Sequence, residues 1–250
     1  FAALSYWPTP QSFAISSALA SFVGVVVAAW LLKSFIRGVV RNFEKKLVMP
    51  ILKSALPIAV SSATGVFLFN VDIVMLGWWR SVEEVGLYSA AQRIVGILAI
   101  FSGFVATATL PSLSRLVHSD REKMGRLLEN AMKIIFIIAI PLVIGGIIIK
   151  SELIGFTFGQ RYLPAANAFT ILLLSILAIH PLAIVSNLLF VFDKQYKMIN
   201  YSIIASVCNV TFNFLLIPRY GIEGAALATL ISFSLYVVLL WKLSKKIYAF

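Results

Sequence analysis

Residues 198–241, MINYSIIASVCNVTFNFLLIPRYGIEGAALATLISFSLYVVLLW, decide the fold class. Only two residues in this stretch are charged. Arg219 lies within the Pro-Arg-Tyr-Gly sequence at 218–221, and Glu223 lies just after it. A helix needs about 20 apolar residues to cross a bilayer core about 30 Å thick, because backbone polar groups cannot stay unpaired in hydrocarbon. The stretch therefore predicts two membrane spans, residues 198–217 and 221–241, joined by a short turn.

The rest of the chain repeats this pattern. Hydrophobic residues make up 60% of the 250 and charged residues 12%, against about 25% charged in a soluble domain, and the mean hydropathy is +0.96. These values exclude a soluble enzyme core, a disordered chain and a disulfide scaffold, and Cys208 is the only cysteine. Five further spans are predicted at residues 11–32, 54–78, 85–110, 131–149 and 164–192. The fold class is therefore an all-α, polytopic transmembrane helix bundle of about seven spans.

The basic residues predict how the bundle is oriented. The net charge is +11, which in a soluble domain suggests nucleic acid, but here Lys and Arg lie between the apolar stretches. Sixteen of the 21 fall in one set of alternate gaps, four fall in the other set, and Arg93 lies inside a span. Because Lys and Arg accumulate in cytoplasmic loops, we expect an external N-terminal segment, a cytoplasmic C-terminus and no nucleic-acid partner.

The longest gap, residues 33–53, contains a basic amphipathic stretch at 37–47. Such a stretch is suited to the anionic inner interface of a membrane, either as a linker between two bundles or as an ordinary cytoplasmic loop. Lys53, at the end of this gap, either extends its ammonium to the interface or guards an inner vestibule. Since the chain opens at Phe1 without an initiator Met, we interpret it as a fragment.

Two charged residues fall inside predicted spans. A charge in hydrocarbon costs about 2.5 to 3.5 kcal/mol on insertion scales, so Asp72 and Arg93 require an explanation. At a rise of about 1.5 Å per residue, they lie roughly 9 and 12 Å below the same surface on consecutive helices. They are therefore expected to be able to meet, as an ion pair that holds the bundle together. The alternative, which we favour, places Arg93 on the wall of a hydrated cavity facing an anionic substrate, because a guanidinium matches phosphate geometry.

Uncharged polar residues also lie within the spans. His180 precedes Pro181, which interrupts helix hydrogen bonding, so this histidine either titrates and responds to protons or is an ordinary core group. Asn209 and Asn213 share one helix face at i, i+4 spacing and either bind neighbouring helices or line the cavity. Asn70 is a weaker example of the same kind.

Several local sequences together resemble one family. Residues 209–229 are similar to the N-x-x-x-N-x-x-L-I-P-x-x-G-x-x-G-A-A-x-A-T sequence in the C-terminal half of polysaccharide flippases. Residues 72–77 with 85–93 resemble the segment D-x-x-x-L-G…V-G-x-Y-x-A-A-x-R that opens that half, and residues 158–166 resemble the family's F-G-x-x-Y-x-x-A loop. The chain thus resembles the O-antigen and exopolysaccharide flippases, which share a superfamily with the multidrug and toxic compound extrusion (MATE) transporters.

This resemblance implies an architecture and an activity. Two six-helix lobes enclose a central cavity, with residues 1–32 as the last helix of the N-terminal lobe, 33–53 as the interlobe linker and 54–250 as the C-terminal lobe. The lobes would move a polyprenyl-diphosphate-linked oligosaccharide across the cytoplasmic membrane by alternating access. The implied partners are the bilayer, the lipid-linked glycan and the missing N-terminal lobe of the same polypeptide. The residues assigned to the substrate path are Arg93, Asp72, Asn70, Lys53, Asn209 and Asn213, and those assigned to coupling with H⁺ or Na⁺ are His180 and Asp72.

Three alternatives remain. A multidrug or cation antiporter of the same fold favours several acids within the membrane, but Asp72 is the only one here. A membrane glycosyltransferase or ligase requires acidic or histidine pairs in a large loop, and the chain has no Asp-x-Asp sequence. A purely structural membrane subunit is the third alternative. We therefore predict a protein that is not an enzyme, with no catalytic residue, metal or cofactor.

Overall fold

The computed structural model describes residues 10–33 and 44–248, which divide into two compact units, residues 1–54 and 55–250. The first unit contains α2 (Pro10–Leu31) and the beginning of α4 (Lys45–Trp79). The predicted linker at 33–53 is therefore helical from Lys45 onward, while residues 34–43 lie outside the described ranges. Hydropathy marks where a helix enters hydrocarbon rather than where it begins, which explains why the helix starts before the predicted span.

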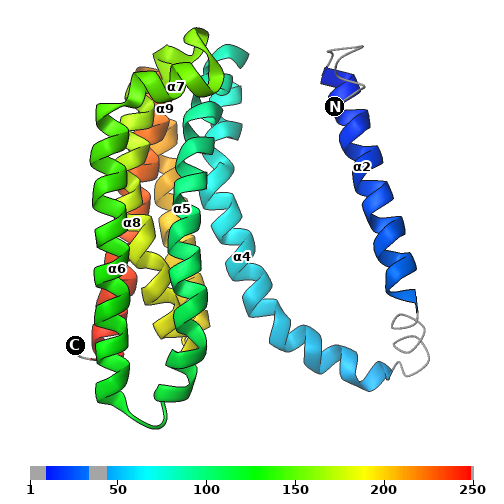
Figure 1. Ribbon diagram of the computed structural model, residues 1–250, viewed down its shortest axis with the longest axis vertical. Coiled ribbons are helices and arrows are strands. Elements are labelled where there is room, and N and C mark those ends of the chain that lie inside the picture. The colour runs from blue at the N-terminus through cyan, green and yellow to red at the C-terminus, as the bar shows by residue number, and fades with distance from the viewer. Residues whose placement is uncertain (1–9, 34–43, 249–250) are drawn as a thin grey trace. The chain divides into compact units, whose positions relative to one another are not determined.

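The second unit is a helical bundle. After α4 come α5 (Val82–Leu116), α6 (Arg121–Ile148), the short α7 (Lys150–Phe158), the 3₁₀ helix η1 (Gln160–Ala165), α8 (Ala166–Val191) and α9 (Gln195–Ile247). Figure 1 shows α5, α6, α8 and α9 running side by side, with α7 across one end of the bundle.

The longest element, α9, is two helices. Its 53 residues would extend roughly 80 Å at about 1.5 Å per residue, more than twice the thickness of a bilayer core. Gly221 interrupts it with φ 56° and ψ −130°, a left-handed conformation that side chains with a Cβ rarely adopt. The break separates the two spans that the sequence predicts on either side of residues 218–221.

The prediction of about seven spans is confirmed. Four helices of the described chain are long and apolar enough to cross a membrane, and the broken α9 is one of them. Shorter apolar helical stretches at Ile15–Leu31 and Ala63–Trp79 lie in α2 and α4. With α9 counted as two, the described residues contain seven apolar helical segments.

Polar capping residues allow two of these helices to extend beyond the apolar stretches. Ser81 caps α5 by accepting a hydrogen bond from the Glu84 backbone N–H (3.2 Å), and Asp120 caps α6 by accepting one from the Lys123 N–H (2.9 Å). The second of these bonds holds the pKa of Asp120 below its usual value. Caps of this kind satisfy backbone donors that the first helical turn leaves unpaired, so both helices begin several residues before the predicted spans.

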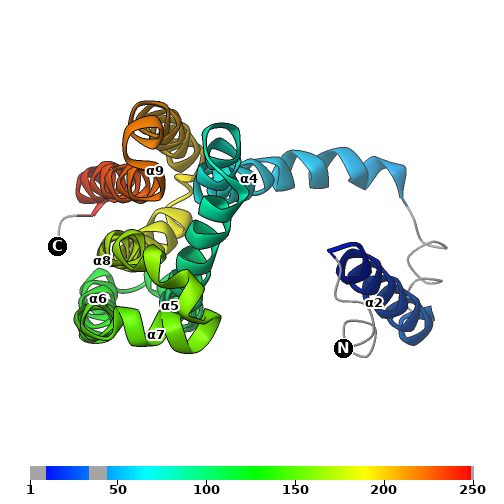
Figure 2. The ribbon, with the colours of Figure 1, turned by 90° about the horizontal axis from the view of Figure 1, so that it is seen from above.

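The core of the second unit is organised around α8. Three clusters of buried apolar residues make up this core, and each contains side chains of α8, for example Phe169, Val185 and Leu188. Seen from above, α8 lies among α5, α6 and α9 (Figure 2). Apolar residues on the outer faces, such as Ile137 and Ile144 of α6, remain exposed, as expected for helices whose solvent is lipid.

Candidate functional site

A groove of about 650 Å³ lies on the second unit between α4, α5 and the α7–η1 segment. Helix α5 contributes the longest wall, and α4 contributes Phe69, Asn70 and Ile73. The amide of Gln92 on α5 donates a hydrogen bond to the Phe69 carbonyl of α4. This bond joins the two helices beneath the groove.

Arg93 is the cationic side chain of this groove. It is exposed and makes no hydrogen bond or ion pair with any described residue. Asn70 lies in the same groove and uses its NH₂ group to donate to the Val66 carbonyl (2.8 Å). Its side-chain carbonyl is thus available as an acceptor beside an unpaired guanidinium. Such a site can neutralise and orient an anion, because a guanidinium presents several donors in a fixed plane.

Asp72 lies elsewhere, in a buried polar cluster. Its side chain is fully buried and accepts hydrogen bonds from the Tyr88 hydroxyl (2.8 Å), the Asn213 amide (2.5 Å) and the Thr229 hydroxyl. These donors come from α5 and from both halves of α9. A buried carboxylate is tolerable when its oxygens are hydrogen-bonded in this way.

Asp72 and Arg93 therefore do not form the pair that their depths allow. Successive residues of a helix point about 100° apart, so Asn70 and Asp72 face nearly opposite directions. Asn70 faces the groove, whereas Asp72 shares a buried face with Leu68 and Leu76. The sequence contains a sign of this orientation, because Leu68, Asp72 and Leu76 are four residues apart and so share one helix face. Counting residues from the membrane surface gives the depth of Asp72 but not the face on which it lies.

The other predicted site residues lie away from the groove. Asn209 and Asn213 are fully buried, and the Asn213 amide donates to the Asn209 carbonyl (2.9 Å) as well as to Asp72. His180 is fully buried in α8, and its imidazole has no side-chain hydrogen bond within the described residues. Lys53 is exposed on α4 in the first unit. The structure thus brings together Arg93 and Asn70 in one place, and Asp72, Asn209 and Asn213 in another.

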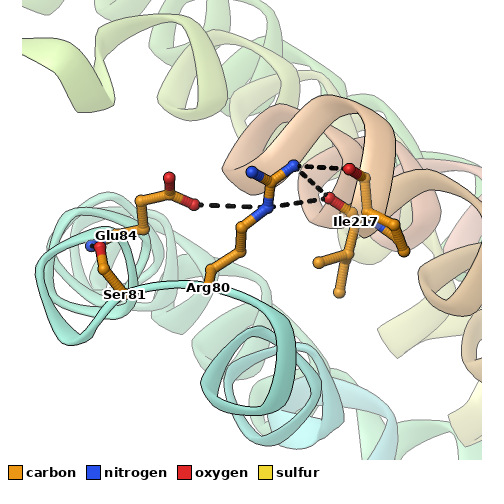
Figure 3. Close-up of polar contacts among 5 residues, drawn as sticks. Arg80, Ser81, Glu84 and Ile217 are labelled. Atoms are coloured by element: carbon orange, nitrogen blue, oxygen red, sulfur yellow. Dashed lines mark hydrogen bonds and ion pairs between the residues drawn. The ribbon is translucent and has the colours of Figure 1, made fainter.

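A polar contact that the sequence analysis missed lies at the end of the bundle near α7. Arg80 donates to the Ile217 carbonyl (2.8 Å from Nη2, 3.1 Å from Nε) and to the Pro218 carbonyl (2.9 Å), and its Nε lies 3.6 Å from the Glu84 carboxylate. Figure 3 shows the guanidinium between these groups. The break at Gly221 leaves the two carbonyls without helical partners. The Pro-x-x-Gly spacing at 218–221 indicates such a break in the sequence, and therefore carbonyls that need another donor.

Three polar contacts consequently join α4 to the first half of α9. Ser202 donates to the Thr64 hydroxyl (3.0 Å), Asn213 donates to Asp72, and Arg80 donates to Ile217. The contacting residues advance together along both helices. Transmembrane helices gain little from hydrophobic association with one another, because lipid is as apolar as their side chains. Hydrogen bonds between them therefore help to specify how they pack.

Two aromatic rings form the end of the groove nearest α7. Gly159 turns the chain between α7 and η1 with φ 92°, and its carbonyl accepts the Tyr162 backbone N–H (3.0 Å). The Phe158 and Tyr162 ring centroids are 5.5 Å apart with the planes tilted by 41°. Both rings line the groove and pack against buried apolar residues behind it.

The family model described as "Polysaccharide biosynthesis protein" matches residues 2–167. The chain belongs to this family. It is 27% identical to the "Probable low-salt glycan biosynthesis flippase Agl15" and 27% identical to the "Probable flippase AglR", both of Haloferax volcanii. These alignments cover 72% and 67% of this chain but 38% and 36% of the relatives.

A further relative is the "Capsular polysaccharide biosynthesis protein CapF" of Staphylococcus aureus, at 26% identity over 71% of this chain and 45% of that protein. The chain thus spans less than half the length of these three relatives. A solved structure of a multidrug resistance MATE family transporter in an outward-facing conformation aligns with a TM-score of 0.64 at 18% identity. That alignment covers 78% of this chain and 44% of the transporter, so the fold of this polytopic membrane protein is MATE-like.

Proposed function

We propose that this chain forms one half of a flippase, which moves a polyprenyl-diphosphate-linked glycan across the cytoplasmic membrane by alternating access. The names of the relatives in Haloferax volcanii support flipping as the activity. The family's description supports a glycan as the cargo. In this proposal the protein supplies binding and conformational change, and no residue acts as a catalyst.

The observation that carries the proposal is Arg93. A cation that remains unpaired in a groove has kept its hydrogen-bonding capacity for a ligand, and a diphosphate can accept two or more of its N–H groups. The one carboxylate that is buried among the described residues, Asp72, is saturated by donors and does not face the groove. This charge distribution favours an anionic ligand over the organic cation that a multidrug antiporter would carry.

Alternating access requires a second wall. The groove is open on one side, and the chain covers about a third to a half of the length of its relatives. We therefore place the missing N-terminal lobe opposite α4 and α5, with the glycan head between the lobes and the prenyl chain in the bilayer. In the same proposal the C-terminus is cytoplasmic, as the distribution of Lys and Arg favours.

Coupling to an ion would involve Asp72. Protonation of this carboxylate, or an approaching cation, would compete with the hydrogen bonds from Tyr88, Asn213 and Thr229. Those bonds join α4, α5 and both halves of α9, so a change at Asp72 reaches both walls of the groove. His180 has no comparable connection, and we assign coupling to Asp72 in preference to it.

The test is transport by the full-length protein in proteoliposomes that contain a fluorescent lipid-linked glycan. Arg93→Ala should lower the flipping rate at least about tenfold, because a charge-assisted hydrogen bond contributes roughly 1.5 to 3 kcal/mol. Arg93→Lys should recover part of the rate, since Lys keeps the positive charge but lacks the planar set of N–H donors that a guanidinium presents. Quenching of the fluorescent lipid from one side measures the rate.

Arg115→Ala is the matched control. Arg115 lies on the same helix and is also exposed, but it is not part of the groove. It should leave flipping unchanged. Undiminished flipping by Arg93→Ala would contradict the proposal. Equal losses of flipping rate in Arg93→Ala and Arg115→Ala would also contradict it, because a positive charge outside the groove would then matter as much as the one inside it.

A further inference from the structure

The aromatic end of the groove has no role in the function proposed so far. Phe158 and Tyr162 belong to the F-G-x-x-Y segment, and the positive φ of Gly159 turns the chain so that both rings face α5. Each ring is partly buried, with one side against the core and the other on the groove. The fold therefore holds these rings in place before any ligand arrives.

The groove changes character along α5. Between its start and Arg93, α5 presents Gly86, Ser89 and Ala90 to the groove, and beyond Arg93 it presents Gly96, Ile97 and Ile100. Seven residues separate Gly86 from Arg93 and another seven separate Arg93 from Ile100. At about 1.5 Å per residue, each half is therefore roughly 10 Å long. On α5, the first half of the groove therefore presents small residues, the second half presents two isoleucines, and the cation lies between them.

This order of surfaces matches an amphiphile with three parts. An aliphatic wall suits an isoprenoid chain, and an unpaired guanidinium suits a diphosphate. A tyrosine ring has an apolar face and a polar tip, which suit the C–H face and the hydroxyls of a sugar. The small residues of α5 that line the same groove as Tyr162 leave room for a sugar ring. The Ser89 hydroxyl, which donates to the Val85 carbonyl (2.7 Å), keeps its acceptor capacity.

From this geometry we infer that Tyr162, supported by Phe158, is the surface that recognises the first sugar of the lipid-linked glycan. The ligand lies with its sugar toward η1, its diphosphate at Arg93 and its first isoprene units at Ile97 and Ile100. This inference rests on the proposed function and adds to it a ligand direction and a specificity-determining residue. It predicts that the gain in affinity due to the sugar depends on Tyr162, whereas the affinity for the diphosphate lipid does not.

Equilibrium binding to the full-length protein in nanodiscs tests the inference. The probes are farnesyl diphosphate and farnesyl diphosphates that carry one glucose or one N-acetylglucosamine on the terminal phosphate. The wild-type protein should bind at least one sugar-bearing probe more tightly than farnesyl diphosphate. Tyr162→Ala should reduce that gain by about two- to tenfold, the range expected for an aromatic contact, and leave binding of farnesyl diphosphate unchanged.

Two variants separate a sugar contact from damage to the fold. Tyr162→Phe keeps the ring and should retain most of the gain, whereas Phe156→Ala removes a ring of α7 that is 93% exposed, lies outside the groove and should change nothing. An unaltered sugar-dependent gain in Tyr162→Ala overturns the inference, as does an equal loss of affinity for every probe. Arg93→Ala should weaken all probes, and its failure to do so would overturn the proposed function instead.

A measurement on the wild-type protein gives an independent outcome. Probes that carry a photoreactive diazirine on the sugar should label the peptide containing Tyr162. Probes that carry it on the isoprenoid should label the peptide containing Ile97 and Ile100. Mass spectrometry of the digested protein identifies the labelled peptides, and the reverse pattern would overturn the assigned direction.

Discussion

Asp72 and Arg93, the two charged residues within the predicted spans, avoid the cost of desolvation in different ways. Asp72 is surrounded by donors from Tyr88, Asn213 and Thr229 and is completely buried. Arg93 keeps contact with an open groove and has no polar partner in the described part of the chain. Buried charges in membrane proteins are either satisfied internally or lie beside water. Asp72 thus has its oxygens hydrogen-bonded within the bundle, whereas Arg93 keeps its hydrogen-bond donors unpaired in the groove.

At this scale we expect Asp72→Ala to destabilise the bundle. The change removes the acceptor that three buried donors share, and each donor that finds no other partner costs about 1 to 3 kcal/mol. Thr229→Val removes only one donor and should cost less than Asp72→Ala. Thermal unfolding of the full-length protein in detergent, followed by circular dichroism, measures the order. A Tm of Asp72→Ala equal to that of the wild type would contradict the assigned hydrogen bonds.

The sequence predicts part of this arrangement and not the rest. Depth along a helix follows from counting residues, so the sequence predicts that Asp72 and Arg93 lie within membrane spans and require an explanation. Rotation about the helix axis depends on which neighbours pack against each face. That information comes from residues distant in sequence, such as Asn213 and Thr229, 141 and 157 positions beyond Asp72.

At the scale of the elements, the break in α9 is the feature with the clearest local cause. Gly221 adopts φ 56° and ψ −130°, and Arg80 hydrogen-bonds the carbonyls that the break exposes. Gly224 has a separate requirement, because a Cβ there would collide with the Leu216 carbonyl. The two glycines of this segment therefore serve different purposes, one for backbone conformation and one for close approach.

We predict that Gly221→Ala lowers the free energy of unfolding by about 1 to 3 kcal/mol, the usual cost of a strained backbone conformation. Its Cβ would also lie 3.3 Å from the Glu84 carboxylate oxygen and 3.6 Å from the Arg80 guanidinium carbon. Gly103→Ala is the matched control, since nothing lies within 4 Å of the added Cβ and Ala is a better helix former than Gly. A fall in Tm for Gly221→Ala alone supports the assignment, and equal Tm values in the two variants would refute it.

The spans were predictable and their ends were not. Apolar stretches identify the part of a helix that lies in hydrocarbon, and this held for both halves of α9. The ends of α5 and α6 depend on Ser81 and Asp120 as caps and on exposed i, i+4 pairs such as Glu122 with Arg126 (2.9 Å). Such short-range contacts extend a helix into water, where hydropathy no longer reports on it.

For the molecule as a whole, the testable property is its sidedness. In a full-length protein from which every native cysteine, Cys208 included, has been removed, single cysteines at Ser81 and Gln160 should react with a membrane-impermeant maleimide added to intact cells, and one at Ser119 should not. All three positions are exposed in the structure, so differences in labelling report on the membrane side. Labelling of Ser119 alone would invert the topology that the basic residues predict.

The contacts of α4, and of Arg80 directly after it, with the first half of α9 constrain how such a molecule can move. Hydrogen bonds at Thr64, Asp72 and Arg80 span 16 positions, roughly 24 Å at about 1.5 Å per residue. Bonds at three heights resist sliding and twisting as well as separation, so these two helices should swing as a single lever. The second half of α9, beyond the glycine break, is tied to this lever through the hydrogen bond from Thr229 to Asp72, so a change of angle between the two halves of α9 requires that bond to break.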